Sequence, residues 1–351
     1  MPAYSLGNYP TPVRRIDGLS TEFAELWIKD DGVSHPSYGG NKLRKLEFLL
    51  PEAARRGARR LVVLGAAGSH QVLATAWFGK SQGFSTLAVV CPQLWSEHAE
   101  TTLRTALALG VQAVPAASVA AFPIALARAA RRGDYVIAPG GAGTLGTLGY
   151  LVAVRELVEQ IRFGQLPEPD LIVVPVASGG TAGGILAGVL REGLASRVLG
   201  ILVADPPRLP SQALVLAQAW AATRRDRGPA GPIELSGRLL IDDRFRGGGY
   251  TWPTPAGEAA LRSGRAHGIR LESTYTAKTF AAALELAAGR RLPVLARERP
   301  ARLLYWHTFS ARAPEVGPLP ALPPELDRLF IGPRSAAATH GVGSDAHDVF
   351  P

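Results

Sequence analysis

Short apolar segments alternate with longer helical segments along most of this 351-residue chain. The predicted strands lie at residues 25–29, 60–65, 85–91, 135–138, 171–176, 198–204 and 302–306. The predicted helices lie at residues 43–57, 70–82, 97–109, 119–132, 146–163, 182–193, 210–224, 254–267 and 277–290. Continuous apolar strands are typical of parallel sheets buried on both faces, and their alternation with helices indicates an α/β fold. We therefore expect open, twisted, mostly parallel sheets flanked by helices.

The length of the chain suits two domains with separate hydrophobic cores. We assign residues 1–45 and 151–331 to a larger domain, and residues 46–150 to a smaller α/β domain inserted in it. The Pro/Gly-rich stretch at 227–237 is predicted to be a surface connection. Residues 332–351 are rich in small side chains without periodicity, which predicts a loose tail.

Composition argues against several classes of protein. With 47% apolar and 19% charged residues the chain is typical of a globular protein, and it has no uncharged apolar run of membrane-spanning length. The N-terminus lacks the pattern of a secretion signal, and the single cysteine, Cys91, allows no intrachain disulfide. We expect a cytoplasmic protein without a membrane partner.

The basic residues outnumber the acidic ones by 38 to 29, which raises the question of nucleic-acid binding. They are scattered as arginine pairs without interleaved aromatic residues, so we expect no nucleic-acid partner. Only five of the 38 are lysines: Lys29, Lys42, Lys45, Lys80 and Lys278. A lysine in such a chain is a candidate for chemistry that arginine cannot perform, such as condensation with an aldehyde.

Lys42 lies in the segment with the strongest local signal, Ser37 to Glu47 (SYGGNKLRKLE). Its two glycines allow an unusual turn, and Asn41 is predicted to cap the following helix. Lys42 would then lie in the first helical turn, where a cation opposes the helix dipole. An ordinary exposed lysine is the alternative, but the Gly-Gly-Asn context favours a reactive amine.

Two further segments place small polar residues between a strand and a helix. Ser69 and His70 open a helix after residues 60–65, and helix N-termini bind anions and cofactor oxygens. Ser178, Gly179, Gly180 and Thr181 follow the strand 171–176 in an order suited to phosphate binding.

Two other kinds of site are not supported. The stretch Gly141 to Gly146 matches the dinucleotide motif G-x-G-x-x-G, but such a site needs an acidic residue at the end of the next strand, and Asp170 lies at its beginning. The seven histidines are too scattered to suggest a metal site.

Taken in order, these segments resemble the family of 1-aminocyclopropane-1-carboxylate deaminase and D-cysteine desulfhydrase. This family is a branch of the tryptophan-synthase-β-like, fold type II pyridoxal-phosphate (PLP) enzymes. The resemblance rests on Gly-Gly-Asn-Lys-x-Arg-Lys-Leu-Glu at 39–47, the glycine-rich stretch 140–150, the phosphate loop 178–181, Tyr-Thr-Ala-Lys at 275–278 and His-Thr at 307–308. It covers residues 8 to 310, nearly the whole globular chain.

The resemblance implies a role for each matching residue. Lys42 would hold PLP covalently and shuttle protons, and Ser69 would lie near the substrate. Tyr250 and Tyr275 would line the substrate pocket. The cofactor would be bound by Lys42, by His70 at the phenolic oxygen, by Thr276 at the pyridine nitrogen and by the phosphate loop of Ser178, Gly179, Gly180 and Thr181. The ligands would meet in a cleft between the domains.

The chain departs from the family in three places. His70 replaces an asparagine, His307-Thr-Phe-Ser310 replaces His-Thr-Gly-Gly, and the segment between Cys91 and Asp134 is shorter.

Thr276 bears on the choice of reaction. In the family a glutamate at this position accompanies ring opening, and a threonine accompanies β-elimination. A hydroxyl is expected to leave the pyridine closer to neutral than a carboxylate does.

We therefore expect a PLP-dependent lyase or deaminase that acts on a small amino acid, with D-cysteine as the named substrate, and that forms a homodimer. The alternatives are a cyclopropane amino acid deaminase, a PLP racemase or dehydratase, and a non-catalytic PLP-binding or amino-acid-sensing protein.

Overall fold

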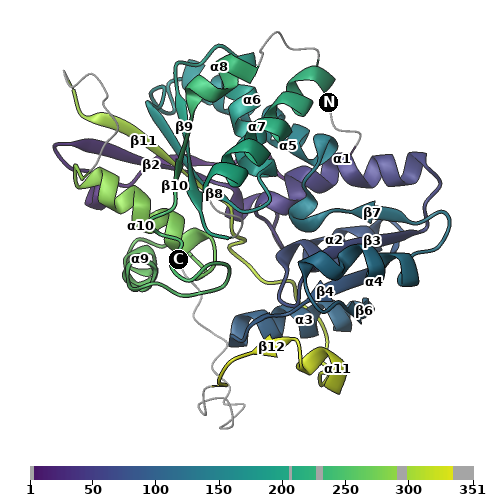
Figure 1. The fold of residues 1–351 in the computed structure, drawn as a ribbon. Coiled ribbons are helices and arrows are strands. Elements are labelled where there is room, and N and C mark those ends of the chain that lie inside the picture. The colour runs from purple at the N-terminus through teal and green to yellow at the C-terminus, as the bar shows by residue number, and fades with distance from the viewer. Residues whose placement is uncertain (1–3, 205–207, 227–231, 291–298, 335–351) are drawn as a thin grey trace.

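The computed structural model describes residues 4–204, 208–226, 232–290 and 299–334. It contains two main sheets, which lie side by side (Figure 1). The larger sheet has the order β1 (Val13–Arg15), β2 (Ala24–Asp30), β11 (Ala301–His307), β8 (Leu171–Val176), β9 (Arg197–Leu202) and β10 (Leu239–Asp242). Its strands are parallel except for β1, which pairs antiparallel with β2.

The smaller sheet is parallel throughout and has the order β6 (Gln112–Pro115), β4 (Ser85–Cys91), β3 (Arg60–Ala66) and β7 (Tyr135–Ile137). A separate pair joins β5 (Gln93–Leu94) to β12 (Phe330–Ile331). This arrangement confirms the expected α/β class with mostly parallel sheets.

Helices cover both faces of the larger sheet because its strands are apolar on both faces. Ile172, Val174 and Val176 of β8 pack with α5 (Thr144–Arg162), α6 (Gly180–Arg191) and α7 (Arg208–Arg225). Leu171 and Val173 point to the opposite face, toward α10 (Thr276–Ala287) and α9 (Pro255–Ala266). This is the period-two alternation of a strand. The short α8 (Pro232–Arg238) joins the first group.

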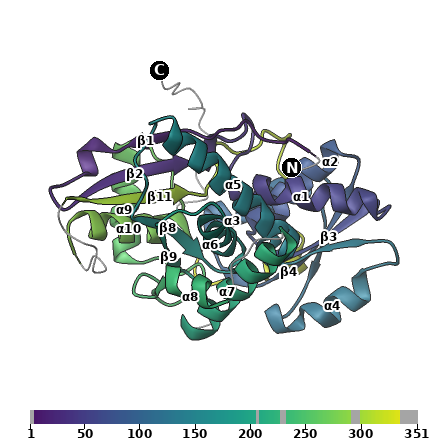
Figure 2. The ribbon, with the colours of Figure 1, turned by 90° about the horizontal axis from the view of Figure 1, so that it is seen from above.

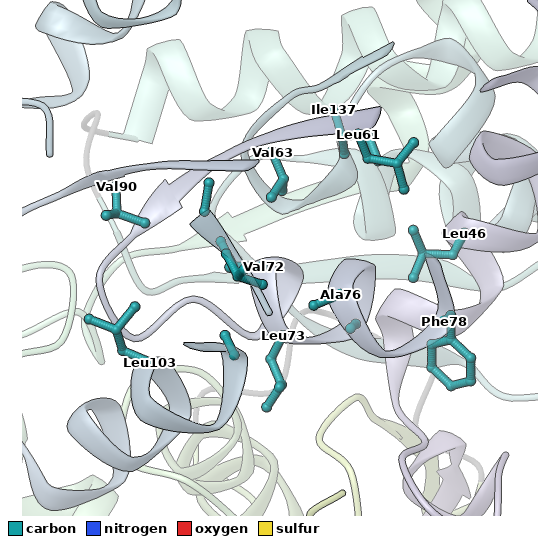
Figure 3. Close-up of a cluster of buried hydrophobic side chains, with 14 of the residues drawn as sticks. Leu46, Leu61, Val63, Val72, Leu73, Ala76, Phe78, Val90, Leu103 and Ile137 are labelled. Carbon is teal, nitrogen blue, oxygen red and sulfur yellow. The ribbon is translucent and has the colours of Figure 1, made fainter. Parts of the chain in front are cut away.

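The smaller sheet also has two covered faces. Leu61, Val63 and Val90 pack with α1 (Asn41–Arg55), α2 (His70–Ser81) and α3 (Glu97–Ala108), in the cluster shown in Figure 3. Val62, Leu64 and Val89 face α4 (Phe122–Ala129) on the other side. Figure 2 shows α1 and α5 at the junction of the two sheets, where they pack against each other.

The C-terminal part of the described chain returns to the smaller sheet. Leu326 of α11 (Pro324–Asp327), Leu329 and Phe330 are buried in the same cluster as α1 and α2. The domain division at residues 45 and 150 stays a proposal. It assigns residues up to 331 to the larger domain, whereas Leu326, Leu329 and Phe330 pack with the core of the smaller sheet.

Several expectations about local structure need correction. Asn41 does not cap α1, because the cap position is Gly40. The stretch 227–237 is not only a connection, because α8 begins at Pro232 within it. The helix expected at 119–132 shortens to α4, after a 3-10 turn at Val119–Ala121. The strands β1, β5, β6, β10 and β12 were not expected, and most of the tail predicted at 332–351 lies outside the described residues. Within those residues no helix is long and apolar enough to cross a membrane.

Candidate active site

The helix that carries Lys42 begins at a turn which only glycine accommodates easily. Gly40 has a φ of +89°, and a Cβ at this position would lie 2.8 Å from the carbonyl oxygen of Thr308. The backbone N–H of Asn41 donates to that carbonyl at 3.0 Å. The start of α1 is thereby attached to the end of β11, and Lys42 lies in its first turn as expected.

The Lys42 amine is held close to an aromatic ring. Its Nζ lies 5.9 Å from the centre of the Tyr275 ring, and no hydrogen bond from Nζ is found within the described part of the chain. Burial lowers the pKa of Lys42 to about 8, although the nearby Glu272 carboxylate acts in the opposite direction. About a tenth of this amine is therefore neutral, and so nucleophilic, at pH 7, far more than for an exposed lysine.

The predicted phosphate-binding segment, residues 178–181 (the phosphate turn), lies against α1, the helix that carries Lys42 (the lysine helix). Gly179 adopts a left-handed conformation, with a φ of +77°, directly before α6. The Asn41 amide donates to the Thr181 hydroxyl at 3.2 Å. The structure thus brings Lys42 and the segment Ser178 to Thr181 together, as the resemblance implies.

Lys45 lies at the same junction and was not singled out by the sequence. Its amine donates to the Gly140 carbonyl at 2.8 Å, and a Cβ on Gly180 would lie 3.2 Å from it. Burial, and then the charge of Lys42, hold the pKa of Lys45 well below its usual range. A buried amine beside a glycine-rich turn is well placed for an anion, because a bound anion would favour its charged form. The sequence did contain one signal for Lys45: it lies three residues, about one helical turn, after Lys42 and therefore on the same side of α1.

The two expected pocket tyrosines contact each other near Lys42. The Tyr275 hydroxyl donates to the Tyr250 hydroxyl at 3.0 Å. Burial raises the pKa of Tyr250 to about 12 and that of Tyr275 well above its usual value. Lys278 holds the loop before Tyr250 by donating to the carbonyls of Arg246 and Gly249, at 2.8 and 2.9 Å. Both phenols therefore stay neutral and can donate hydrogen bonds.

Thr276 opens α10 and is buried. Its hydroxyl oxygen lies 3.0 Å from Oε1 of Glu272, a buried carboxylate that sequence reasoning missed. The charge of Glu272 acts to raise the pKa values of Lys42, Tyr250 and Tyr275. A single acidic residue before a helix carries little sequence signal, since it is common at helix starts.

Ser69 and His70 lie at the start of α2, as predicted. Ser69 occupies the cap position, but its side chain makes no capping bond. The His70 ring is bonded on both sides, by the Tyr38 hydroxyl at Nδ1 (2.7 Å) and by Nε2 of the exposed His98 at Nε2 (2.8 Å). Burial, followed by His98, Lys42 and Arg270, lowers the pKa of His70 well below its usual value, so the ring is neutral at physiological pH. Phe309 packs edge-on against both rings.

Comparison with known proteins agrees with this arrangement. A model of the family described as pyridoxal-phosphate dependent enzyme matches residues 4–295. The chain belongs to this family. PLP is therefore its cofactor, and the resemblance drawn from the sequence motifs is confirmed.

Relatives of this PLP enzyme carry different names. It is 32% identical over 93% of its length to nocardicin C-9' epimerase of Nocardia uniformis subsp. tsuyamanensis, covering 98% of that protein. It is 30% identical over 81% of its length to D-cysteine desulfhydrase of Yersinia pestis (strain Pestoides F), covering 88% of that protein. The crystal structure of an ACC deaminase homologue superimposes with a TM-score of 0.73 at 26% identity, covering 89% of this chain and 93% of the other.

The residues present fit PLP. The uncommitted Lys42 amine suits the aldehyde, and the glycine-rich turn with Lys45 beside it suits a phosphate. His70 fits its expected role less directly. Both of its ring nitrogens already have protein partners, so a bond to the cofactor would require one of them to be released.

Proposed function

We propose that this PLP enzyme removes the β-substituent of a small amino acid and releases a keto acid and ammonia, with D-cysteine as the test substrate. The observation that carries the proposal is the Lys42 amine, lowered in pKa and without a hydrogen-bond partner in the described chain. It lies beside the Tyr275 ring, and its neighbour Asn41 contacts Thr181 of the phosphate turn. Bound PLP supplies the electron sink that lets bonds at the α-carbon of an amino acid break.

The roles proposed for the surrounding residues follow from their chemistry. Lys42 holds the cofactor and accepts the proton from the α-carbon, and the Ser69 hydroxyl donates a hydrogen bond to the substrate carboxylate. Ser178, Gly179, Gly180 and Thr181 hold the phosphate, and Thr276 meets the pyridine nitrogen. In the overall reaction the carbon–sulfur bond of D-cysteine breaks, sulfide leaves, and water supplies the keto oxygen of pyruvate.

A second candidate reaction is epimerisation at the α-carbon. It is favoured by the relative named nocardicin C-9' epimerase, which matches over 93% of the chain. Ring opening of the cyclopropane amino acid is favoured less, because Thr276 is not a carboxylate. A PLP-binding sensor would turn over none of these compounds.

Product analysis separates these candidates. Purified protein is incubated with a panel of D- and L-amino acids and with the cyclopropane amino acid. We expect pyruvate and sulfide from D-cysteine. Release of 2-oxobutyrate would indicate ring opening, and an inverted amino acid without keto acid would indicate epimerisation.

The lysine assignment has its own test. Borohydride treatment of the holoenzyme, followed by peptide mass spectrometry, is expected to place the cofactor on Lys42. Lys42→Ala should abolish labelling and activity, whereas Lys80→Ala, at the end of α2, should change neither. Labelling of any other lysine would refute the proposal.

The protein is further proposed to act in the cytoplasm as a homodimer. Cys91, its one cysteine, is buried and unpaired. Sedimentation equilibrium of the holoenzyme tests the dimer.

A further inference from the structure

We propose that Glu272 is a positioning residue which, through the hydroxyl of Thr276, keeps the pyridine nitrogen of PLP protonated. The inference rests on the proposed function in one respect, the place of Thr276 at that nitrogen. It goes beyond that function because it assigns Glu272 a role and reverses the usual expectation for a threonine at this position.

Glu272 is fixed in place by hydrogen bonds that its carboxylate accepts from its neighbours. It is 7% exposed and lies just before α10. Its carboxylate accepts the backbone N–H of Thr274 at 2.8 Å, of Tyr275 at 2.9 Å and of Thr276 at 2.7 Å. Three backbone N–H donors thus converge on this one carboxyl group and fix its orientation beside Thr276.

The Thr276 hydroxyl is almost fully committed to Glu272. Its oxygen accepts the backbone N–H of Glu272 at 2.8 Å. The same oxygen lies 3.0 Å from Glu272 Oε1 and 3.2 Å from the Glu272 carbonyl oxygen. A carboxylate and a carbonyl cannot donate, so the single hydroxyl hydrogen must point toward one of these two oxygens.

This count leaves the hydroxyl with one free acceptor position and no hydrogen to give. A hydroxyl has one donor and two acceptor positions, and one acceptor position already receives the Glu272 N–H. A bare pyridine nitrogen has no partner here, but a protonated one can donate to the free position. The hydrogen stays with Glu272, because a hydrogen bond to a carboxylate is roughly twice as strong as a neutral one.

The consequence concerns the choice between reactions. When PLP is bound, a protonated ring would be a stronger electron sink for bonds at the α-carbon than an unprotonated one. Return of a proton to the α-carbon then competes with loss of the β-substituent. The pair Thr276–Glu272 would thus supply through a relay what a carboxylate at position 276 supplies directly. This is compatible with elimination, with epimerisation and with ring opening, so product analysis and not residue 276 must separate them.

Nitrogen NMR of the holoenzyme loaded with ¹⁵N-labelled PLP tests the inference without measuring activity. In the wild type we expect the pyridine resonance at the position of the protonated ring. Glu272→Gln retains an acceptor oxygen at the helix start but removes the charge, so the hydroxyl hydrogen is free to turn to the ring. The resonance should then shift toward that of the unprotonated ring.

Two further variants complete the experiment. Thr276→Val removes the acceptor and should shift the resonance in the same direction. Glu258→Gln, which changes an exposed acid in the first turn of α9, should leave it unchanged. An unprotonated ring in the wild type overturns the inference even if the variants do not fold, and so does a Glu272→Gln spectrum identical to that of the wild type. Failure of borohydride to label Lys42 overturns the proposed function itself, whereas a labelled Lys42 with an unprotonated ring overturns only the role of Glu272.

Discussion

At the scale of single residues, the lysines separate by what their amines contact. Burial lowers the pKa of Lys29, Lys42, Lys45 and Lys278. Lys29 bonds Glu156 and Gln160, while Lys45 and Lys278 donate to backbone carbonyls. Lys42 has no such partner among the described residues, so its amine, when neutral, is free to react with an aldehyde.

The rate at which PLP is captured covalently by the apoprotein should follow this pKa. Because the pKa of Lys42 is lowered to about 8, the amine is half neutral near pH 8 and about nine-tenths neutral at pH 9. We expect the rate to rise about tenfold per pH unit below about pH 7, more slowly toward pH 8, and to level off above about pH 9. Stopped-flow absorbance from pH 6 to 10 measures it. A rate that still climbs steeply above pH 9 would contradict the burial argument, and Lys80→Ala should reproduce the wild-type profile.

At the scale of elements, glycines set how closely the site helices approach one another. A Cβ on Gly149 of α5 would lie 2.1 Å from the carbonyl oxygen of Arg44 in α1. A Cβ on Gly184 of α6 would lie 2.3 Å from the carbonyl oxygen of Thr147 in α5. The lysine helix and the phosphate-turn helix are thus joined through α5 by two close glycine contacts.

Gly184→Ala should separate these helices. The added methyl group meets backbone rather than a movable side chain, so we expect destabilisation of about 1–3 kcal/mol and weaker PLP binding. Urea denaturation and a PLP titration measure the two effects. Gly237→Ala in α8, where a Cβ meets nothing within 4 Å, should cost no stability. Equal behaviour of both variants would show that close approach of the helices is not required.

The sequence could predict the long elements and most of the site, and its failures share a cause. Apolar runs identify buried strands such as β8, whereas β6 and β10 are short and partly exposed and lack that pattern. Motif order locates Lys42 and the turn at Ser178. Residues that act through a tertiary contact, such as Glu272 and Lys45, are invisible until the fold brings them to their partners. Gly146 of the G-x-G-x-x-G stretch likewise serves packing, since a Cβ on it would lie 2.0 Å from the carbonyl oxygen of Gly141.

At the scale of the whole molecule, α1, the helix that carries Lys42, shares its hydrophobic core with the C-terminal part of the described chain. Leu43, Leu46 and Leu50 of α1 share one buried cluster with Leu329 and Phe330 near the end of the described chain. Strand β12 pairs with β5 beside this cluster. The position of Lys42 therefore depends on packing that is complete only when residues 324–331 have returned to the smaller sheet.

Phe330→Ala tests this dependence. Phe330 is 8% exposed, so loss of its ring should leave a cavity and cost about 3 kcal/mol, near the lower end for buried aromatic residues. Ile331 is its neighbour in the same strand but is 54% exposed, and Ile331→Ala should change stability by less than about 0.5 kcal/mol. Urea denaturation of both variants measures the difference. Because the cavity opens in the cluster that supports α1, only Phe330→Ala should also weaken PLP binding. If Phe330→Ala lost stability but bound PLP as tightly as the wild type, the other contacts of α1, with α5 and with the carbonyl oxygen of Thr308, would be sufficient to position Lys42.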